Sequence, residues 1–215
     1  MTKKSEFSQQ DVDILIDDTV YNGFFTVKKI CLRHKLFAGG WSSPIEREVF
    51  MRGAAVAAVL YDPINDLIGL IQQFRVGALA ARSNEHSPWL FEVVAGMHTP
   101  GKTAEEVITQ ELEEEAGIRP QRLEHICEYY SSPGGTDETV NLFCALAPLE
   151  NAGGIYGLED ENEDIKMVVY RADEMFQRLY DDIGNAATLI SLQWLQTNRR
   201  RLQHKCIQHQ NGVAT

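Results

Sequence analysis

Residues 96–118 read GMHTPGKTAEEVITQELEEEAGI, and this stretch decides the class of fold. Two glycines and a proline before Thr103 predict a loop. Thr103 followed by Glu106 matches the capping box of a helix N-terminus, and Gly117 stands where a helix commonly ends on a glycine. The stretch therefore predicts a glycine-rich loop followed by a helix over residues 104–116.

This expected helix carries acidic residues on the side that should face a core. At about 100° per residue, four positions form one apolar stripe: Ala104, Ile108, Leu112 and Ala116. Glu115 projects into the stripe, and Glu111 and Glu114 lie along its edge. Like charges at these spacings repel, and the helix dipole is negative at this end.

Two interpretations of these acids are open. An acidic helix face often serves only solubility, which is our interpretation for Glu105, Glu106 and Glu113. A carboxylate that faces a core, however, costs on the order of several kcal/mol unless a cation neutralises it. Oxygen ligands without neighbouring Cys or His favour Mg²⁺ or Mn²⁺ over zinc. Glu111, Glu114 and Glu115 are therefore candidates for a divalent-metal site.

The rest of the chain indicates an α/β protein. Alternating, β-branched and aromatic runs predict strands over residues 20–37, 45–60, 67–74, 90–95, 121–130, 139–147 and 165–170. Helical patterns follow over residues 172–180 and 186–203. We expect an N-terminal β-element over residues 1–50 joined to an α/β domain over residues 51–215.

Composition limits the function classes. The 215 residues contain 20 Lys and Arg against 31 Asp and Glu, a net charge of −11, which disfavours nucleic acid as a partner. An anionic substrate would need metal ions or local arginines at its site. The N-terminus has no signal-peptide pattern, and no apolar run reaches membrane-spanning length. The four cysteines form no CxxC pair. We therefore expect no membrane partner, reduced thiols and a cytoplasmic location.

The same stretch resembles the Nudix box, G-x5-E-x7-R-E-U-x-E-E-x-G-U, in which U is aliphatic. The matching positions are Gly96, Glu111, Leu112, Glu114, Glu115, Gly117 and Ile118. YNGFF, EREVFMRG, PWLFEVVAGM, SSPGGT with Pro133, and GLEDENEDI resemble the bacterial ADP-ribose pyrophosphatase branch of the Nudix family. Two positions depart from the box, because Lys102 replaces its first glutamate and Gln110 its arginine.

The resemblance implies an α/β/α Nudix sandwich with a mixed sheet and an N-terminal antiparallel β-element used in dimerisation. It also implies hydrolysis of the pyrophosphate bond of ADP-ribose to AMP and ribose 5-phosphate. The cofactor would be Mg²⁺, or alternatively Mn²⁺, with two or three ions. The implied metal ligands are the Ala95 carbonyl, Glu111, Glu115 and Glu163. Glu114 would assist them, and Glu161 would activate the attacking water.

Substrate contacts are implied in the same way. Arg52 and Arg75 resemble phosphate-binding arginines, and Phe24 resembles an aromatic residue that stacks on adenine. Arg47 and Glu48 resemble the contribution of the partner subunit in a homodimer. The full implied substrate-binding set is Phe24, Arg47, Glu48, Arg52, Arg75, Met97, Ser132, Gly134, Gly135 and Thr136.

Alternatives remain at this stage. The enzyme could act on another nucleoside diphosphate sugar, or the chain could be a Nudix homologue that binds ligand with weakened catalysis, as Lys102 and Gln110 suggest. Lys102 itself has two interpretations. It could compete with Mg²⁺ for the carboxylates, or it could contact a phosphate oxygen of the substrate.

Overall fold

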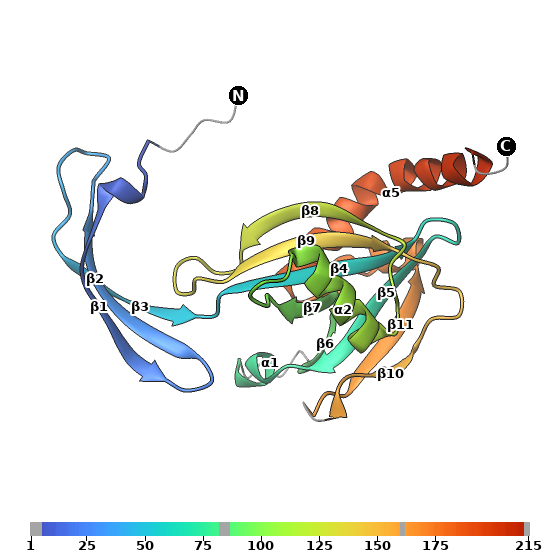
Figure 1. Cartoon of the computed structure of the whole chain (residues 1–215), viewed down its shortest axis with the longest axis horizontal. Helices are drawn as coiled ribbons and strands as arrows, with labels where there is room; N and C mark the ends of the chain where they lie inside the picture. The colour runs from blue at the N-terminus through green and yellow to red at the C-terminus, as the bar shows by residue number, and fades with distance from the viewer. Residues whose placement is uncertain (1–5, 82–86, 160–161, 213–215) are drawn as a thin grey trace. The chain divides into compact units, whose positions relative to one another are not determined.

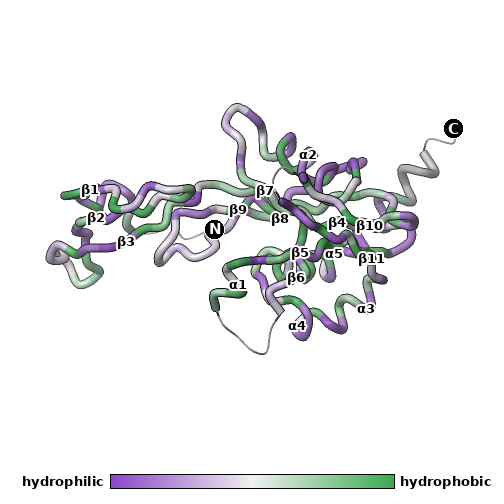
Figure 2. Tube along the Cα trace, turned by 90° about the horizontal axis from the view of Figure 1, so that it is seen from below, coloured by the Kyte–Doolittle hydropathy of each residue, from purple (hydrophilic) through white to green (hydrophobic). Residues whose placement is uncertain are grey.

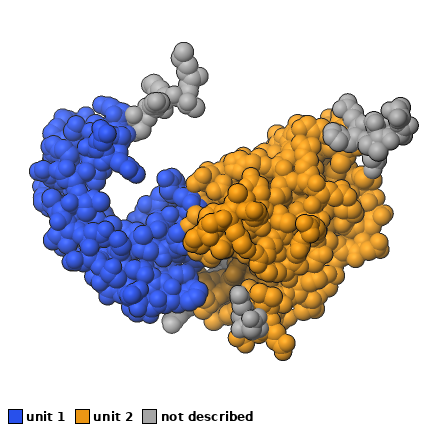
Figure 3. All heavy atoms as spheres, viewed as in Figure 1, with its two compact units in different colours: residues 1–53, 130–139 blue, residues 54–129, 140–215 orange. Residues whose placement is uncertain are grey.

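The computed structural model describes residues 6–81, 87–159 and 162–212, the last of these with side chains to residue 206. The chain divides into two compact units (Figure 3). The first contains residues 1–53 and 130–139, and the second contains residues 54–129 and 140–215. The segment 130–139 thus belongs with the N-terminal part of the chain, far from it in sequence.

The first unit is built on a three-stranded antiparallel sheet with the order β1-β2-β3. Its strands are β1 (Val12–Asn22), β2 (Thr26–His34) and β3 (Ile45–Met51). A short 3-10 helix, η1 (Gln9–Asp11), precedes them and is capped by Ser8. Polar and apolar segments alternate along all three strands (Figure 2), and many of their side chains are exposed.

Two expected strands are each divided in the structure, so the boundaries predicted for them are wrong. The expected strand 20–37 is interrupted where the chain reverses between Asn22 and Thr26, and the preceding strand begins at Val12. The expected strand 45–60 breaks at Gly53, whose φ of +75° lies in the left-handed region that glycine adopts without strain.

The second unit contains a mixed sheet that has eight strands among the described residues, with the main order β10-β11-β5-β4-β9-β8. In chain order these strands are β4 (Ala54–Asp62), β5 (Leu67–Phe74), β6 (Trp89–Glu92), β7 (Val94–Met97), β8 (Arg122–Tyr130), β9 (Thr139–Leu146), β10 (Gly154–Tyr156) and β11 (Ile165–Arg171). The helices are α1 (Val76–Ala80), α2 (Ala104–Ala116), α3 (Ala172–Gln177), α4 (Leu179–Asp182) and α5 (Ala186–Gly212). β6 pairs with β5, and β7 pairs with β4.

Strand β4 supplies side chains to both faces of this sheet, because successive side chains of a strand point to opposite sides. Val56, Ala58 and Leu60 pack in one buried cluster with the apolar side of α2. Ala57, Val59 and Tyr61 pack in a second cluster with α3, α4 and α5. Figure 1 shows α2 over one face of the sheet. The expected α/β/α sandwich is confirmed.

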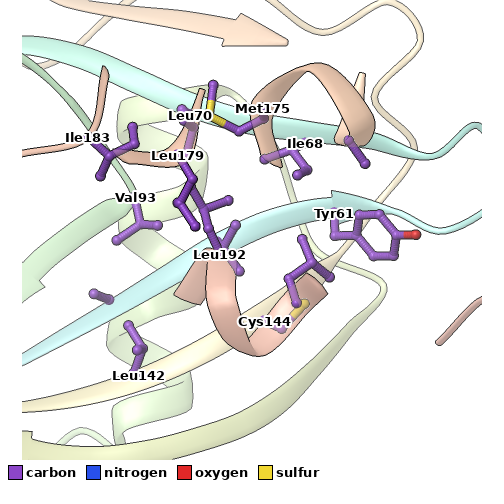
Figure 4. Packing of buried hydrophobic residues seen from close by; sticks show 14 of the residues in the cluster. Tyr61, Ile68, Leu70, Val93, Leu142, Cys144, Met175, Leu179, Ile183 and Leu192 are labelled. Carbon is purple, nitrogen blue, oxygen red and sulfur yellow. The ribbon is translucent and has the colours of Figure 1, made fainter. Parts of the chain in front are cut away.

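The core on the α5 side is closely packed. Figure 4 shows Leu192 of α5 among Val93, Leu142 and Leu179, and all four are at most 2% exposed. Burying one such side chain stabilises a fold by about 1.5–3 kcal/mol. α5 runs to Gly212, beyond the residue 203 expected from the apolar pattern. No helix in the described part of the chain is long and apolar enough to span a membrane.

The helix expected over residues 104–116 is confirmed as α2, with both of its predicted ends. The Thr103 hydroxyl accepts the N–H of Glu106 at 3.2 Å, and the Glu106 carboxylate accepts the N–H of Thr103 at 2.7 Å. Gly117 ends the helix with a φ of +64°. These local contacts fix the two ends of α2, and its apolar stripe fixes which side faces the sheet.

Candidate active site

Among the described residues of α2, Glu115 is the only buried acid, with 4% of its surface exposed. Its Oε2 accepts the backbone N–H of Ala95 in β7 at 3.3 Å. The pKa of Glu115 is raised to about 8, mainly by burial and to a smaller extent by the charges of Glu111 and Glu163. The Ala95 hydrogen bond and the charge of Arg75 oppose this rise.

Glu111 lies against the backbone of β7. The glycine at position 96 makes this possible, because a Cβ there would overlap the Glu111 carboxylate. Gly96 pairs with Val56 of β4, so the sheet fixes its position. Met97 ends the strand and is 46% exposed. Ala95, Gly96 and the carboxylates of Glu111 and Glu115 therefore form one site between α2 and β7.

The acidic loop that follows β10 begins beside the C-terminal end of α2. Gly157 donates its N–H to the backbone carbonyl of Glu114 at 3.4 Å. The ring of Tyr156 lies over Gly117, where a Cβ would approach it to 2.5 Å. Glu163 is half-buried, and its Oε2 accepts the N–H of Leu158 at 3.3 Å. Glu163 is thus held on the α2 side of the unit. Glu161 lies outside the described residues.

The donor set fits a divalent cation in chemistry. A carboxylate whose pKa is raised by burial and by two neighbouring carboxylates is stabilised in its charged form by a cation. Carboxylate and carbonyl oxygens are the ligands of hard divalent ions. Within the described residues, no three acidic, His or Cys side chains converge closely enough to chelate an ion. The acids are collected beside Glu115 without surrounding a common point.

Arg75 follows β5 directly and forms an ion pair. Its Nε lies 2.7 Å from Oε2 of Glu92, whose side chain is only 12% exposed. Gln73 donates to the same oxygen at 3.4 Å. Pairing of β5 with β6 brings these residues together. Sequence reasoning missed Glu92, and the only available signal was a carboxylate within an otherwise apolar strand.

Arg52 and the loop 132–136 meet inside the first unit. Phe50 donates its N–H to the carbonyl of Gly135 at 2.8 Å, and Phe50 and Thr136 form a β-bridge. The Arg52 guanidinium lies 5.0 Å from the ring centre of Phe25. Its Nε lies 2.8 Å from Oε1 of Glu138, at an angle that makes an ion pair without a hydrogen bond.

Asp137 completes this junction, and sequence reasoning missed it together with Glu138. Oδ1 of Asp137 accepts the backbone N–H of Arg52 at 2.6 Å and the backbone N–H of Gly53 at 3.0 Å. The remaining members of the loop, Ser132 and Gly134, are exposed. The contacts of Asp137 cross 85 positions of sequence, and no local pattern indicates them.

The other expected substrate contacts of the first unit are at its surface. Phe24 is 95% exposed and touches Phe25 edge-on at 4.7 Å between ring centres. Arg47 and Glu48 are exposed on β3, and Arg47 donates to the backbone carbonyl of Glu46 at 2.7 Å. These residues are therefore accessible to a ligand or to another protein chain.

The glycine of β7 and the acidic side chains of α2 that lie beside it belong to the stretch that resembles the Nudix box, and comparison with known proteins agrees. Residues 51–190 match the model of the NUDIX domain, and the chain belongs to the Nudix family of hydrolases. Hydrolases of this kind depend on divalent metal ions.

More detailed similarity points to one branch of the family. The chain is 44% identical over 204 residues to the ADP-ribose pyrophosphatase of Haemophilus influenzae, covering 94% of both proteins. It is 38% identical over 200 residues to the ADP-ribose pyrophosphatase of Escherichia coli strain K12, covering 93% of this chain and 94% of the relative. A crystal structure described as an ADP compounds hydrolase has the same fold, with a TM-score of 0.68, 24% identity and coverage of 92% of this chain and 99% of that one.

Proposed function

We propose that this protein hydrolyses the pyrophosphate bond of ADP-ribose to AMP and ribose 5-phosphate, with Mg²⁺ as the cofactor, or Mn²⁺ in its place, and two or three ions in the site. The observation that carries the proposal is the Glu115 carboxylate, buried against β7 with a pKa raised to about 8. Without a cation this carboxyl is mainly protonated at neutral pH, and a bound cation would stabilise its ionised form. The similarity to ADP-ribose pyrophosphatases over nearly the whole chain supports the substrate.

The reaction consumes one water molecule. Its oxygen bonds to one phosphorus, the bridging P–O bond breaks, and each product leaves with its own phosphate. When bound, divalent ions stabilise charge on the attacking and leaving oxygens. The Ala95 carbonyl, Glu111, Glu115 and Glu163 would hold these ions, with Glu114 assisting. Glu161 would accept the proton of the attacking water.

The proposed substrate contacts are those that the Nudix resemblance implies. Arg75 and Arg52 are the proposed phosphate contacts, since a guanidinium binds phosphate with two parallel hydrogen bonds. Each is now paired with a carboxylate, Glu92 or Glu138. Phe24 offers a free ring face to adenine, and Met97 is exposed beside the proposed metal site. Ser132, Gly134, Gly135 and Thr136 would contact the terminal ribose.

We further propose a cytoplasmic homodimer in which residues 1–50 form the dimerisation element and part of the adenine pocket, and residues 51–215 form the catalytic domain. The exposed apolar side chains of β1, among them Ile14, Ile16 and Tyr21, support a partner surface in this element. Arg47 and Glu48 would complete the pocket of the other subunit. A fully active monomer at micromolar concentration in sedimentation would contradict the shared site.

The test is AMP release across a panel of dinucleotides and nucleoside diphosphate sugars, with Mg²⁺ and with EDTA. ADP-ribose should give the highest kcat/KM, and EDTA should abolish release. A higher kcat/KM for another nucleoside diphosphate sugar would move the assignment to that substrate. Tight binding of ADP-ribose without any turnover would instead identify a ligand-binding homologue.

A further inference from the structure

Three side chains form a chain of hydrogen bonds along the edge of α2. Lys102, in the loop before the helix, donates from Nζ to Oε1 of Gln110 at 2.6 Å. Gln110 then donates from Nε2 to Oε1 of Glu114 at 2.8 Å. The Lys102 backbone is held by a turn in which its N–H bonds to the carbonyl of Thr99 at 3.1 Å. Lys102 is therefore linked to Glu114 through the side-chain amide of Gln110.

The donor and acceptor groups allow this series of hydrogen bonds only one orientation. An ammonium offers donors alone, and an ionised carboxylate offers acceptors alone. Gln110 must therefore turn its oxygen towards Lys102 and its NH₂ group towards Glu114. Both hydrogen bonds involve a charged partner, which makes them stronger than bonds between neutral groups. A polarised chain of this kind restricts the rotation of the Glu114 carboxylate.

Lys102 and Gln110 are the two residues at which this chain departs from the Nudix box, and they depart together. The box has an acceptor, glutamate, at the first position and a donor, arginine, at the second. This chain has a donor at the first position and a residue that both accepts and donates at the second. The two substitutions compensate each other in hydrogen bonding.

Glu114 is also joined to the acidic loop, because its backbone carbonyl accepts the N–H of Gly157. We propose that Lys102 and Gln110 are positioning residues that act as one unit to hold the Glu114 carboxylate beside the metal-binding acids. This inference rests on the proposed function for the role of Glu114. It adds a third interpretation of Lys102 to the two drawn from the sequence, because the ammonium is directed at Gln110.

The experiment is a double-mutant cycle on the full chain with Lys102→Met, Gln110→Met and the double variant. The first readout is Mn²⁺ binding without substrate, measured by electron spin resonance of the free ion. Each single change should weaken binding at least about threefold, and the double variant should lose no more than the worse single one, since either change already breaks the unit. Circular dichroism checks the fold, which should persist because Lys102 and Gln110 are exposed.

Rescue variants separate positioning from a general effect of charge. Lys102→Arg keeps the donor and should bind Mn²⁺ as the wild type does. Lys102→Glu alone should weaken binding, and adding Gln110→Arg should restore it, because a guanidinium at the second position can donate to carboxylates on both sides. Glu113→Gln, on the exposed face of α2, changes the charge without touching the chain of hydrogen bonds and should leave binding unchanged.

The second readout is hydrolysis of ADP-ribose. The Met variants should need at least about threefold more Mg²⁺ for half-maximal rate, with the KM for ADP-ribose at saturating Mg²⁺ unchanged. Single-variant losses that multiply in the double variant, or Mn²⁺ binding unchanged in both single variants, would overturn the inference. If the Mn²⁺-binding cycle shows this coupling but the wild type releases no AMP, the positioning role of Lys102 and Gln110 is upheld and the proposed function is rejected.

Discussion

Oε2 of Glu115 accepts the backbone N–H of Ala95 at 3.3 Å, which ties a buried carboxylate of α2 to strand β7. One hydrogen bond does not replace the hydration that this carboxylate loses on burial, and Glu111 and Glu163 add negative charge. The metal-free protein therefore holds an acid whose charge opposes folding.

The stability of the metal-free protein should fall as pH rises. The folded-state pKa of Glu115 is about 8 against an ordinary value of 4.5, so between these values the folded state binds more protons than the unfolded state. Stability is then highest below about pH 4.5 for this group and decreases by up to about 1.4 kcal/mol per pH unit towards pH 8. Urea unfolding in EDTA measures the slope.

Glu115→Gln should remove this slope, and Glu113→Gln should retain it, since Glu113 lies on the exposed face of α2. The Glu115→Gln variant should also be more stable than wild type at pH 8. Parallel stability curves for wild type and Glu115→Gln between pH 5 and pH 8 would show that the group does not titrate in this range.

Gly96→Ala should separate activity from stability. The new Cβ would overlap the Glu111 carboxylate, and this flexible side chain can rotate away at a cost of about 1 kcal/mol. We expect the turnover of ADP-ribose to fall at least about tenfold while urea unfolding changes little. Gly184→Ala, where the Cβ meets open space, is the matched control. Equal activity in the two variants would show that Glu111 is not part of the site.

Glu161→Gln should lower kcat by about 10²–10⁴-fold with little change in KM, because a general base acts mainly in the transition state. Glu163→Gln should instead raise the Mg²⁺ concentration needed for half-maximal rate. Steady-state kinetics at several Mg²⁺ concentrations distinguish the two. The reverse pattern would exchange the roles of these two loop acids.

Phe24 and Phe25 should respond differently to truncation. Phe24→Ala should raise the KM for ADP-ribose by about 5- to 150-fold, since base stacking contributes about 1–3 kcal/mol. It should leave stability unchanged because the ring is 95% exposed. Phe25→Ala should destabilise the protein by more than about 1 kcal/mol, since its ring packs on Phe50 at 4.9 Å. An unchanged KM in Phe24→Ala would move adenine elsewhere.

Local chemistry explains how much of this architecture the sequence predicts. The ends of α2 follow from Thr103, Glu106 and Gly117, which act within one helical turn, and the burial of Glu115 follows from helical periodicity. The turn after Asn22 was also predictable, because Asn-Gly is a strong hairpin signal. The strand predicted over residues 20–37 did not take this signal into account.

The remaining contacts depend on pairing across the fold. Arg75 meets Glu92 only because β5 pairs with β6. Asp137 reaches Arg52 only because the segment 130–139 belongs to the first unit. Strand register and loop docking are set by the whole molecule, so no window of sequence around either arginine contains these partners.

Turnover of ADP-ribose by wild type, Glu115→Gln and Glu113→Gln at saturating Mg²⁺ tests the central claim most directly, namely that the acidic side of α2 facing β7 is the hydrolytic site. Each protein is first confirmed as folded by its urea unfolding curve. We predict that Glu115→Gln releases AMP at least about a hundredfold more slowly than wild type, with Glu113→Gln unaffected. A Glu115→Gln variant that is folded and as active as wild type would contradict the account.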